Sequence, residues 1–395
     1  GLRLDSKNVQ MAIGGRVWID HWFIDDEDLV GAAAAAAGTA APIVDDEDYE
    51  SGFSWTSLRL HNAGLLYGHV EWKLELEFND VNDPSLADAY IGIVGLDDCI
   101  GCAMPNIRIG HQKVPHGLEA LTDGDYMTFM DRSSASYAFT WGRRYAVMLH
   151  DHFRGGQLNY QLAYFLTDGG AGFQSSTEFD GDGNEGYGLA GRITYTPWYD
   201  CECTCRRLHI GVGAYTVEDD NTVSFSTFGM PDVGDLDPLA TTGAMANDGY
   251  FGWNVELALV YGPFSLQAEY FSVDIDNPAI GDPTFTGWYA QASYWLTGEC
   301  RNYDRGVFGR VSPCCNFLDN DCCCYGGIEV AVRYDVVDLT DGAVAGGEHT
   351  GYTVGLNWHM NPNARIMINY FNDNIERAGV DEAMTGIGVR FQVDW

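Results

Sequence analysis

Eleven cysteines carry the most reactive side chains in this chain of 395 residues. They fall in three groups, each beside or between strand-like segments: Cys99 and Cys102; Cys201, Cys203 and Cys205; and Cys300, Cys314, Cys315, Cys322, Cys323 and Cys324. In an oxidising compartment such cysteines form disulfides, and an odd number leaves at least one thiol free or linked to another chain. The alternative is metal binding, because Cys99 and Cys102 have the spacing of a ligand pair, but neither a second such pair nor paired histidines complete a zinc pattern. We expect disulfides, whose pairing the sequence does not give.

Two other stretches carry potential metal ligands. Asp180, Asp182 and Asn184 offer oxygen ligands for calcium in a glycine-rich loop, although the glycine and distal glutamate of an EF-hand are missing, so a solvated acidic loop is the alternative. His150-Asp151-His152 resembles a metal triad, but neighbouring residues of a strand point to opposite faces, which favours a polar cluster at a strand end. Because no nucleophile elbow, phosphate loop or dinucleotide motif is present, we expect no enzyme and no cofactor other than calcium.

The net charge of −36 argues against nucleic acid as a partner, because the chain has no basic surface to neutralise phosphates. The acidic clusters fall between strand-like segments, which predicts acidic loops. No apolar run approaches the length of a membrane-spanning helix, and 31–44, rich in alanine, is interpreted as a loop or a short loop helix. No targeting segment precedes Gly1, so we expect the precursor to carry one that is missing here.

Alternation of apolar and polar residues predicts sixteen strands, an even number as in single-chain bacterial barrels. In 71–78, Trp72, Leu74, Leu76 and Phe78 alternate with four charged residues, and 386–395 alternates to a terminal Trp395. The predicted strands are 9–24, 52–62, 66–78, 86–95, 106–113, 143–152, 156–166, 187–199, 205–217, 249–261, 264–273, 284–296, 327–337, 349–360, 364–372 and 383–395. The last strand must pair with an element already made, which in a closed barrel is the first strand.

The connections distinguish a membrane barrel from the alternative of two or more soluble β domains. Short connections such as 61–65 and 359–363 alternate with long ones such as 25–51, 114–142 and 218–248. Short turns on one rim and long loops on the other are typical of outer-membrane barrels. The predicted fold class is therefore all-β: a transmembrane antiparallel β-barrel of about sixteen strands, formed by 1–395 as a single unit, with the C-terminus on the periplasmic, short-turn rim.

Several segments resemble the phosphate- and polyphosphate-selective porin O and P family. The segment 107–119 with 128–132 is similar to the fifth strand and inward-folded third loop of that family, and 261–270, 287–299 and 353–358 resemble further landmarks in the same order. The resemblance implies a sixteen-stranded, trimeric, passive pore in a bacterial outer membrane. Partners would be the lipid bilayer with its lipopolysaccharide, two further copies of the chain, and small ions or phosphate as solute.

The long connection 114–142 is the expected constriction loop inside the lumen, with an external loop as the alternative. It contributes the candidate constriction residues Glu119, Asp123, Asp125, Asp131 and Arg132. Alternation directs seven arginines into the lumen: Arg16, Arg59, Arg108, Arg192, Arg333, Arg365 and Arg390. An acidic loop facing arginines produces a transverse field that favours small charged or dipolar solutes. The chain departs from the family where a lysine is expected in this loop and Asp123 and Asp125 stand instead, so we expect a porin for small hydrophilic solutes and ions, with phosphate as one candidate.

Segment 299–325 is too long for a periplasmic turn, which predicts a small, cysteine-rich periplasmic insertion, and a free cysteine there would give access to a periplasmic partner. The insertion and the acidic loops also support a second hypothesis. In that hypothesis the barrel is a structural outer-membrane anchor with a disulfide-rich periplasmic platform and cation-binding surface loops. A filled lumen would favour the anchor, and an open lumen would favour the porin.

Overall fold

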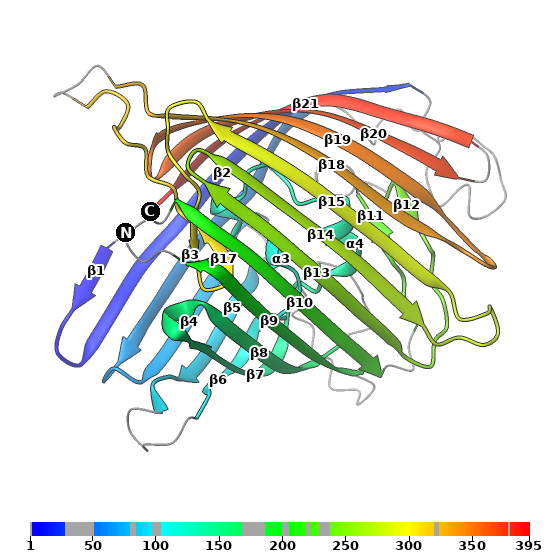
Figure 1. Ribbon diagram of the computed structural model, residues 1–395, viewed down its shortest axis with the longest axis horizontal. Coiled ribbons are helices and arrows are strands. Elements are labelled where there is room, and N and C mark those ends of the chain that lie inside the picture. Colours follow the sequence, from blue (N-terminus) through cyan, green and yellow to red (C-terminus); the bar gives the residue numbers. More distant parts are fainter. Residues whose placement is uncertain are drawn as a thin grey trace.

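The computed structural model describes residues 2–27, 51–79, 84–96, 104–167, 186–199, 205–218, 222–228, 238–319, 324–377 and 380–395. Sixteen antiparallel strands close into one barrel, as the alternation predicts (Figure 1). They are β2 (Val9–Glu27), β3 (Gly52–Leu66), β4 (Val70–Glu77), β5 (Ser85–Ile93), β6 (Asn106–Lys113), β7 (Arg143–Phe153), β8 (Leu158–Leu166), β9 (Tyr187–Tyr199), β10 (Arg206–Glu218), β13 (Tyr250–Tyr261), β14 (Phe264–Ile275), β15 (Thr284–Trp295), β18 (Gly327–Asp341), β19 (Val344–Asn361), β20 (Ala364–Arg377) and β21 (Val380–Asp394). No helix within these described ranges has the length and apolarity to cross a bilayer.

The barrel closes where the last strand meets the first long one. In β21, Phe391 lies opposite Ile19 of β2, and the pairing runs from Arg16 to Glu27. Trp395 exchanges backbone hydrogen bonds with Gly15, which ends this pairing at the C-terminus. Beyond that point a short strand that the sequence did not indicate, β1 (Leu2–Asp5), pairs with residues 10–13 of β2 and continues the sheet. The N- and C-terminal ends therefore lie at the same rim (Figure 1).

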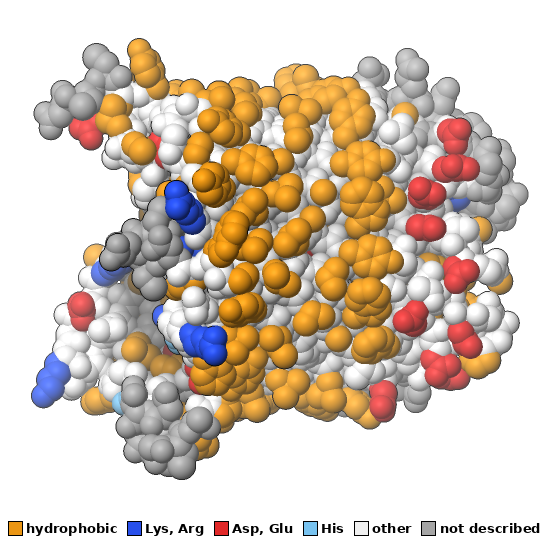
Figure 2. Space-filling view, in the orientation of Figure 1, with side chains coloured by type: hydrophobic (Ala, Val, Ile, Leu, Met, Phe, Trp, Pro, Cys, Tyr) orange, Lys and Arg blue, Asp and Glu red, His pale blue; other side chains and the backbone are white. Residues whose placement is uncertain are grey.

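The strands expose apolar side chains and bury polar ones, the reverse of a soluble sandwich. In β9, Leu189 and Ile193 are about half exposed, whereas Arg192 and Thr194 are buried. Figure 2 shows the result as a broad hydrophobic band across the outer face, with acidic side chains gathered at one end and lysines and arginines at the other. A band of this kind is what a barrel presents to the hydrocarbon core of a bilayer.

The connections differ between the two rims, with exceptions to the predicted alternation. The rim with the termini has mostly short turns, such as Gly262–Pro263 between β13 and β14, although the connection 296–326 is long; four connections at the other rim are long, namely 28–51, 114–142, 167–186 and 219–249. There, however, β18 and β19 continue to a tight turn at Gly342–Ala343, and β20 and β21 are separated by two residues only. The predicted end at 337 was therefore too early and the predicted start at 349 too late. Likewise β20 continues past the predicted end at 372, and β21 begins before the predicted start at 383, because both hairpins extend beyond their apolar stretches.

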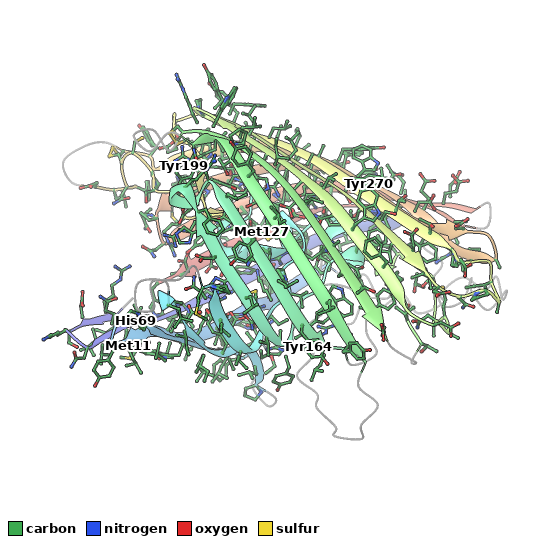
Figure 3. All side chains as sticks on the ribbon, turned by 60° about the horizontal axis from the view of Figure 1, so that its bottom comes forward. Met11, His69, Met127, Tyr164, Tyr199 and Tyr270 are labelled. Atoms are coloured by element: carbon green, nitrogen blue, oxygen red, sulfur yellow. A yellow bond between two sulfur atoms is a disulfide. The ribbon has the colours of Figure 1, made fainter. Side chains whose placement is uncertain are left out.

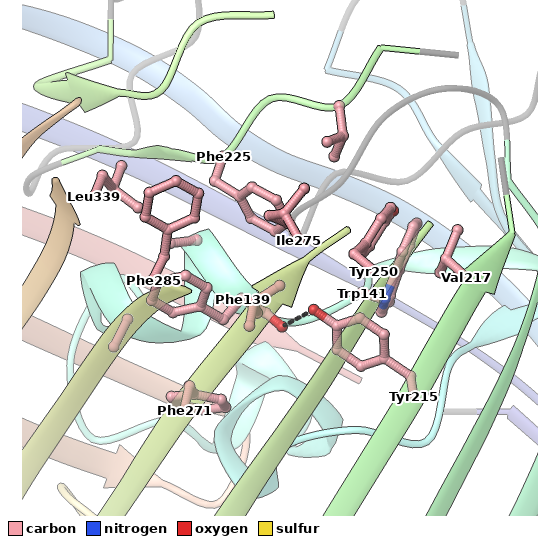
Figure 4. Close-up of a cluster of buried hydrophobic side chains, with 14 of the residues drawn as sticks. Phe139, Trp141, Tyr215, Val217, Phe225, Tyr250, Phe271, Ile275, Phe285 and Leu339 are labelled. Carbon is pink, nitrogen blue, oxygen red and sulfur yellow. Dashed lines mark hydrogen bonds between the residues drawn. The ribbon is translucent and has the colours of Figure 1, made fainter. Parts of the chain in front are cut away.

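One side of the barrel interior is filled by packed loops. The connection 114–142 forms α3 (Leu118–Leu121), η1 (Gly124–Tyr126) and α4 (Ser134–Phe139), and a further hairpin of β11 (Ser226–Thr227) and β12 (Ala240–Thr241) packs beside α4. Phe139, Trp141, Phe225 and Phe285 are fully buried in the resulting apolar cluster (Figure 4). Tyr215 from β10 joins it and donates a hydrogen bond to the carbonyl of Phe139 at 3.4 Å. These aromatic contacts hold α4 against the wall formed by β10, β13, β14, β15 and β18.

Candidate pore constriction

The loop 114–142 is held inside the barrel by its backbone. Met127, labelled in Figure 3, is 5% exposed, and its carbonyl accepts a hydrogen bond from Arg365 of β20 at 2.7 Å. The next carbonyls toward α4 accept from wall side chains in the same way: Thr128 from Asn357, Met130 from Arg390, and Asp131 from Arg333. A row of inward-facing donors on β18–β21 thus satisfies an irregular backbone that would otherwise be buried without partners. This row explains how an irregular segment is stable across the lumen.

The side chain of Glu119 fixes the helical part of the same loop. One carboxylate oxygen accepts hydrogen bonds from the backbone amide of Ser133 at 2.9 Å, from its hydroxyl at 2.8 Å and from the Ser136 hydroxyl at 2.7 Å. Its backbone amide and that of Leu118 donate to the two carboxylate oxygens of Glu269 on β14 at 2.9 and 2.7 Å. Glu119 is 4% exposed, so its position is that of a buried anchor.

Asp131 and Arg132 also face protein rather than open lumen. Asp131 is 6% exposed and lies 3.5 Å from the guanidinium of Arg390. Arg132 donates to the carbonyl of Thr122 at 3.0 Å within the loop itself. Burial lowers the pKa of Arg132 from its ordinary value, while the nearby Tyr137 and Glu119 oppose that shift. Both residues hold the loop together.

Asp123 is the most accessible of the five candidate constriction residues. Its side chain is 40% exposed, and one oxygen lies 3.2 Å from Arg16 on β2. Asp125 is close by, 3.6 Å from the same guanidinium, and is 15% exposed. Burial raises the pKa of Asp123, but Arg16, Lys113 and Lys73 outweigh burial and hold that pKa well below its usual range. Burial and then the charge of Asp123 raise the pKa of Asp125 to about 7. Asp123 is therefore a permanent anion, and Asp125 titrates near neutral pH.

The wall opposite this loop tip, formed by β2–β7, carries both charge signs. Arg59 on β3 pairs with Glu75 at 2.9 Å and with Glu77. Lys73 on β4 pairs with Asp88 at 2.6 Å and with Glu75 at 2.9 Å. Arg59 and Lys73 keep about a fifth of their side-chain surface accessible. Water therefore reaches this wall, whereas the side of the lumen next to the apolar cluster is closed.

Two further pairs extend this charged wall. Arg143 on β7 pairs with Asp88 at 2.7 Å, and Arg108 on β6 donates to both oxygens of Glu71 at 2.9 and 3.2 Å. The wall carboxylates could not be recognised as a site from the sequence, because alternation gives their strand faces but not their partners on neighbouring strands. The field in the lumen is therefore set by paired charges on one wall as well as by the loop.

The seven arginines expected in the lumen all have partners inside the barrel, but they divide into two groups. Arg59 and Arg108 remain accessible, at 18% and 22% of their side-chain surface. The remaining five are at most 7% exposed: Arg16, Arg192, Arg333, Arg365 and Arg390. Arg192, for example, binds Glu256 through two hydrogen bonds at 2.8 and 2.7 Å. Most of these arginines therefore serve packing, and two belong to the accessible wall.

The cysteines form two disulfides within the described residues, Cys205–Cys300 and Cys315–Cys324, while Cys314 is free and exposed. The other candidates lie outside the described residues: Cys99, Cys102, Cys201, Cys203, Cys322 and Cys323. The calcium candidates Asp180, Asp182 and Asn184 and the alanine-rich 31–44 lie outside them too.

His150, Asp151 and His152 are at the end of β7, and the described part of the chain holds no group of three side chains that could bind a metal ion. The predicted insertion 299–325 does not stand apart from the barrel as a separate platform. Its strands β16 (Asn302–Asp304) and β17 (Val307–Gly309) form a hairpin that packs inside the barrel against α3.

Comparison with known proteins agrees with this architecture. A model of the family described as phosphate-selective porin O and P matches residues 35–395. An uncharacterized protein of Caulobacter vibrioides is 28% identical over 323 residues, which are 81% of this chain and 62% of that relative, so the chain spans less than two thirds of its length. Porin O of Pseudomonas aeruginosa is 27% identical over 360 residues, 82% of this chain and 78% of that protein.

Among solved structures, in-vitro folded OmpT of Vibrio cholerae has the same fold. It superposes with a TM-score of 0.59 at 12% identity and covers 100% of both chains. The trimer form of OmpT gives a TM-score of 0.57 at 12% identity, with 98% of this chain and 100% of that chain covered. With the family match over nearly the whole chain and the closed sixteen-strand barrel, the chain belongs to the phosphate-selective porin O and P family and is an outer-membrane porin.

Proposed function

We propose that small hydrophilic solutes and ions diffuse passively along the β2–β7 wall, past the tip of the loop at Asp123. The observation that carries this proposal is the uneven filling of the barrel. Aromatic residues and buried ion pairs pack the side next to β10–β18, whereas Asp123, Lys73 and Arg59 stay accessible on the other side. An aqueous path lined by charged side chains admits polar solutes and excludes apolar ones.

The charge balance of this path supports a general porin in preference to a phosphate-specific one. Five cations on the wall have a carboxylate partner within 3.2 Å: Arg16, Arg59, Lys73, Arg108 and Arg143. A phosphate would have to compete with these carboxylates for each of the five groups. We therefore propose weak charge selectivity, with cations slightly preferred because Asp123 is the accessible loop charge. Phosphate, to which the family name refers, is one solute among several.

Titration of phosphate against chloride current tests this proposal. Purified protein in a planar bilayer is held in potassium chloride while inorganic phosphate is added in steps. We expect the single-channel current to change only as the bulk conductivity of the solution changes. A half-maximal block at low phosphate concentration would contradict the proposal, because it would show that phosphate displaces the wall carboxylates.

We further propose that the rim with the termini faces the periplasm and that the long-loop rim faces outward, next to lipopolysaccharide. The acidic side chains gathered at the long-loop end support the second assignment, because divalent cations can bridge them to anionic headgroups (Figure 2). Assembly as a homotrimer is proposed from the trimer form known for OmpT, and calcium binding by the acidic loops remains a proposal. The exposed thiol of Cys314 at the terminal rim would then be available to a periplasmic partner. Protease and thiol-reagent accessibility in intact cells tests the orientation.

A further inference from the structure

The connection between β15 and β18 returns into the barrel it leaves. Its β16–β17 hairpin packs Phe308 and Tyr303, each 2% exposed, against Leu118 of α3 and against Ala258 and Val260 of β13. The amide of Phe308 donates to the hydroxyl of Thr122 at 3.4 Å, which joins the hairpin to the constriction loop. Behind the front strands in Figure 1, β17 is visible close to α3. The hairpin therefore occupies the lumen on the side of the terminal rim.

Polar contacts and a disulfide fix the hairpin to the wall. The hydroxyl of Tyr303 lies 2.6 Å from Nδ1 of His209 on β10 and 3.2 Å from the hydroxyl of Thr196 on β9. The carbonyl of Gly306 accepts a hydrogen bond from Arg192 at 2.8 Å. The Cys205–Cys300 disulfide ties the base of the insertion to the start of β10. Because its tip, its middle and its base all contact the barrel wall, the hairpin has a fixed position in the lumen.

The tip of the hairpin presents one arginine to open space. Arg305 and Gly306 form a two-residue turn in which both have positive φ, 47° and 89°. This conformation is that of the type I′ turns that join tight hairpins. The Arg305 side chain is 58% exposed, and its ion pair with the equally exposed Asp304 is 3.8 Å long. Its charge is therefore much less compensated than that of the buried arginines.

Arg305 lines a cavity of about 680 Å³ at the terminal end of the charged wall. Arg108, Glu71, His150 and Asp151 line the same cavity from β4, β6 and β7. Nε2 of His150 lies 3.8 Å from a carboxylate oxygen of Glu71, so the lining of the cavity is polar here. A solute that passes along the charged wall to this end of the barrel must cross this cavity, which we call the vestibule.

From this arrangement we propose that the β16–β17 hairpin is a second selectivity element of the pore, with Arg305 as its specificity-determining residue. The guanidinium attracts solutes with a carboxylate or phosphate group into the vestibule, in series with the anionic Asp123 farther in. The proposal rests on the passive diffusion path along the β2–β7 wall. It goes beyond that path by assigning selectivity to an insertion outside the constriction loop.

Charge substitutions at the hairpin tip test the proposal. Asp and Asn accept positive φ at a type I′ turn, so Arg305→Asp and Arg305→Asn preserve the hairpin while changing its charge by two units and one unit. The reversal potential in a potassium chloride gradient gives the chloride-to-potassium permeability ratio. For Arg305→Asp we expect this ratio to fall by about twofold to threefold, since the charge is exposed to water and partly screened. Arg305→Asn should give a smaller fall.

Lys7→Glu is the matched control, because it makes the same two-unit change at the same rim on the exposed turn between β1 and β2. We expect it to leave the ratio unchanged. An unchanged ratio in Arg305→Asp, together with a shifted ratio in Asp123→Asn, would overturn the role of the hairpin and leave the diffusion path intact. A shift in Lys7→Glu equal to that in Arg305→Asp would also overturn it, because any charge at this rim would then act alike. Absence of conductance in the unmodified protein would instead overturn the diffusion path itself.

Discussion

Neutralising the loop tip with Asp123→Asn is expected to shift the pore toward anions. The side chain is 40% exposed and its pKa lies well below the usual range, so the wild-type residue carries a full negative charge at any pH used for recording. Asparagine has nearly the same shape and keeps the oxygen that accepts from Arg16. The substitution therefore removes charge with little change in packing.

The size of the shift follows from the distance between this charge and a passing ion. At about 5 Å in water, two unit charges interact by about 0.8 kcal/mol. Screening at 0.1 M salt, where the Debye length is about 10 Å, lowers this to about 0.5 kcal/mol. Removing Asp123 raises the energy of a cation and lowers that of an anion by this amount, so the permeability ratio changes by about 1 kcal/mol, or about fivefold.

The assay is the reversal potential of single channels in a potassium chloride gradient, compared between wild type and Asp123→Asn. The matched control is Asp125→Asn recorded at pH 5, where the raised pKa of Asp125 already leaves the carboxyl protonated. We expect a shift of about fivefold toward chloride for Asp123→Asn and almost none for the control. An unchanged ratio, or a shift toward potassium, would refute the placement of the path beside Asp123.

Three further predictions concern titration and packing. Raising the pH from 5 to 9 deprotonates Asp125 around its pKa of about 7 and adds one negative charge to the loop. The reversal potential should therefore move toward that of potassium, and Asp125→Asn should abolish this change. Arg390→Met leaves Asp20 buried without its ion pair and should lower the free energy of unfolding in urea by about 3–5 kcal/mol, whereas Asp20→Leu with Arg390→Met should recover most of it. Phe139→Ala opens a cavity in the apolar cluster and should cost about 3–5 kcal/mol in the same measurement, against about 1 kcal/mol for Phe139→Leu; equal losses would contradict a tightly packed cluster.

The wall of the barrel could be predicted from the sequence because alternation with period two is a local signal. All sixteen predicted strands are present, and β6 and β9 have the predicted bounds. The extended ends of β18–β21 were missed because those hairpins continue through mostly polar residues, among which Leu339, Val344 and Ile375 are too few to mark a strand. The four-residue β1 is too short to show a period.

The arrangement of the loops and side chains inside the barrel could be predicted only in part, because it depends on contacts between residues far apart in the chain. The length of 114–142 indicates a loop with a special place, but not that Glu119 is an anchor and Asp123 the accessible charge. Nothing local to Arg390 shows that Asp20 is its partner, 370 residues away. The inward course of the β16–β17 hairpin was missed for the same reason. In the sequence, a long cysteine-rich connection resembles a separate subdomain, and only the structure shows that Phe308 packs against Leu118 inside the barrel.

The central claim is that one side of the barrel stays open while the other is packed. The single-channel conductance of the purified, unmodified protein in a planar bilayer tests it most directly. We predict discrete current steps that scale with salt concentration and are present in every active preparation. Insertion of folded protein without any current steps would contradict the claim, because the packed loops would then close the whole lumen and the barrel would be an anchor.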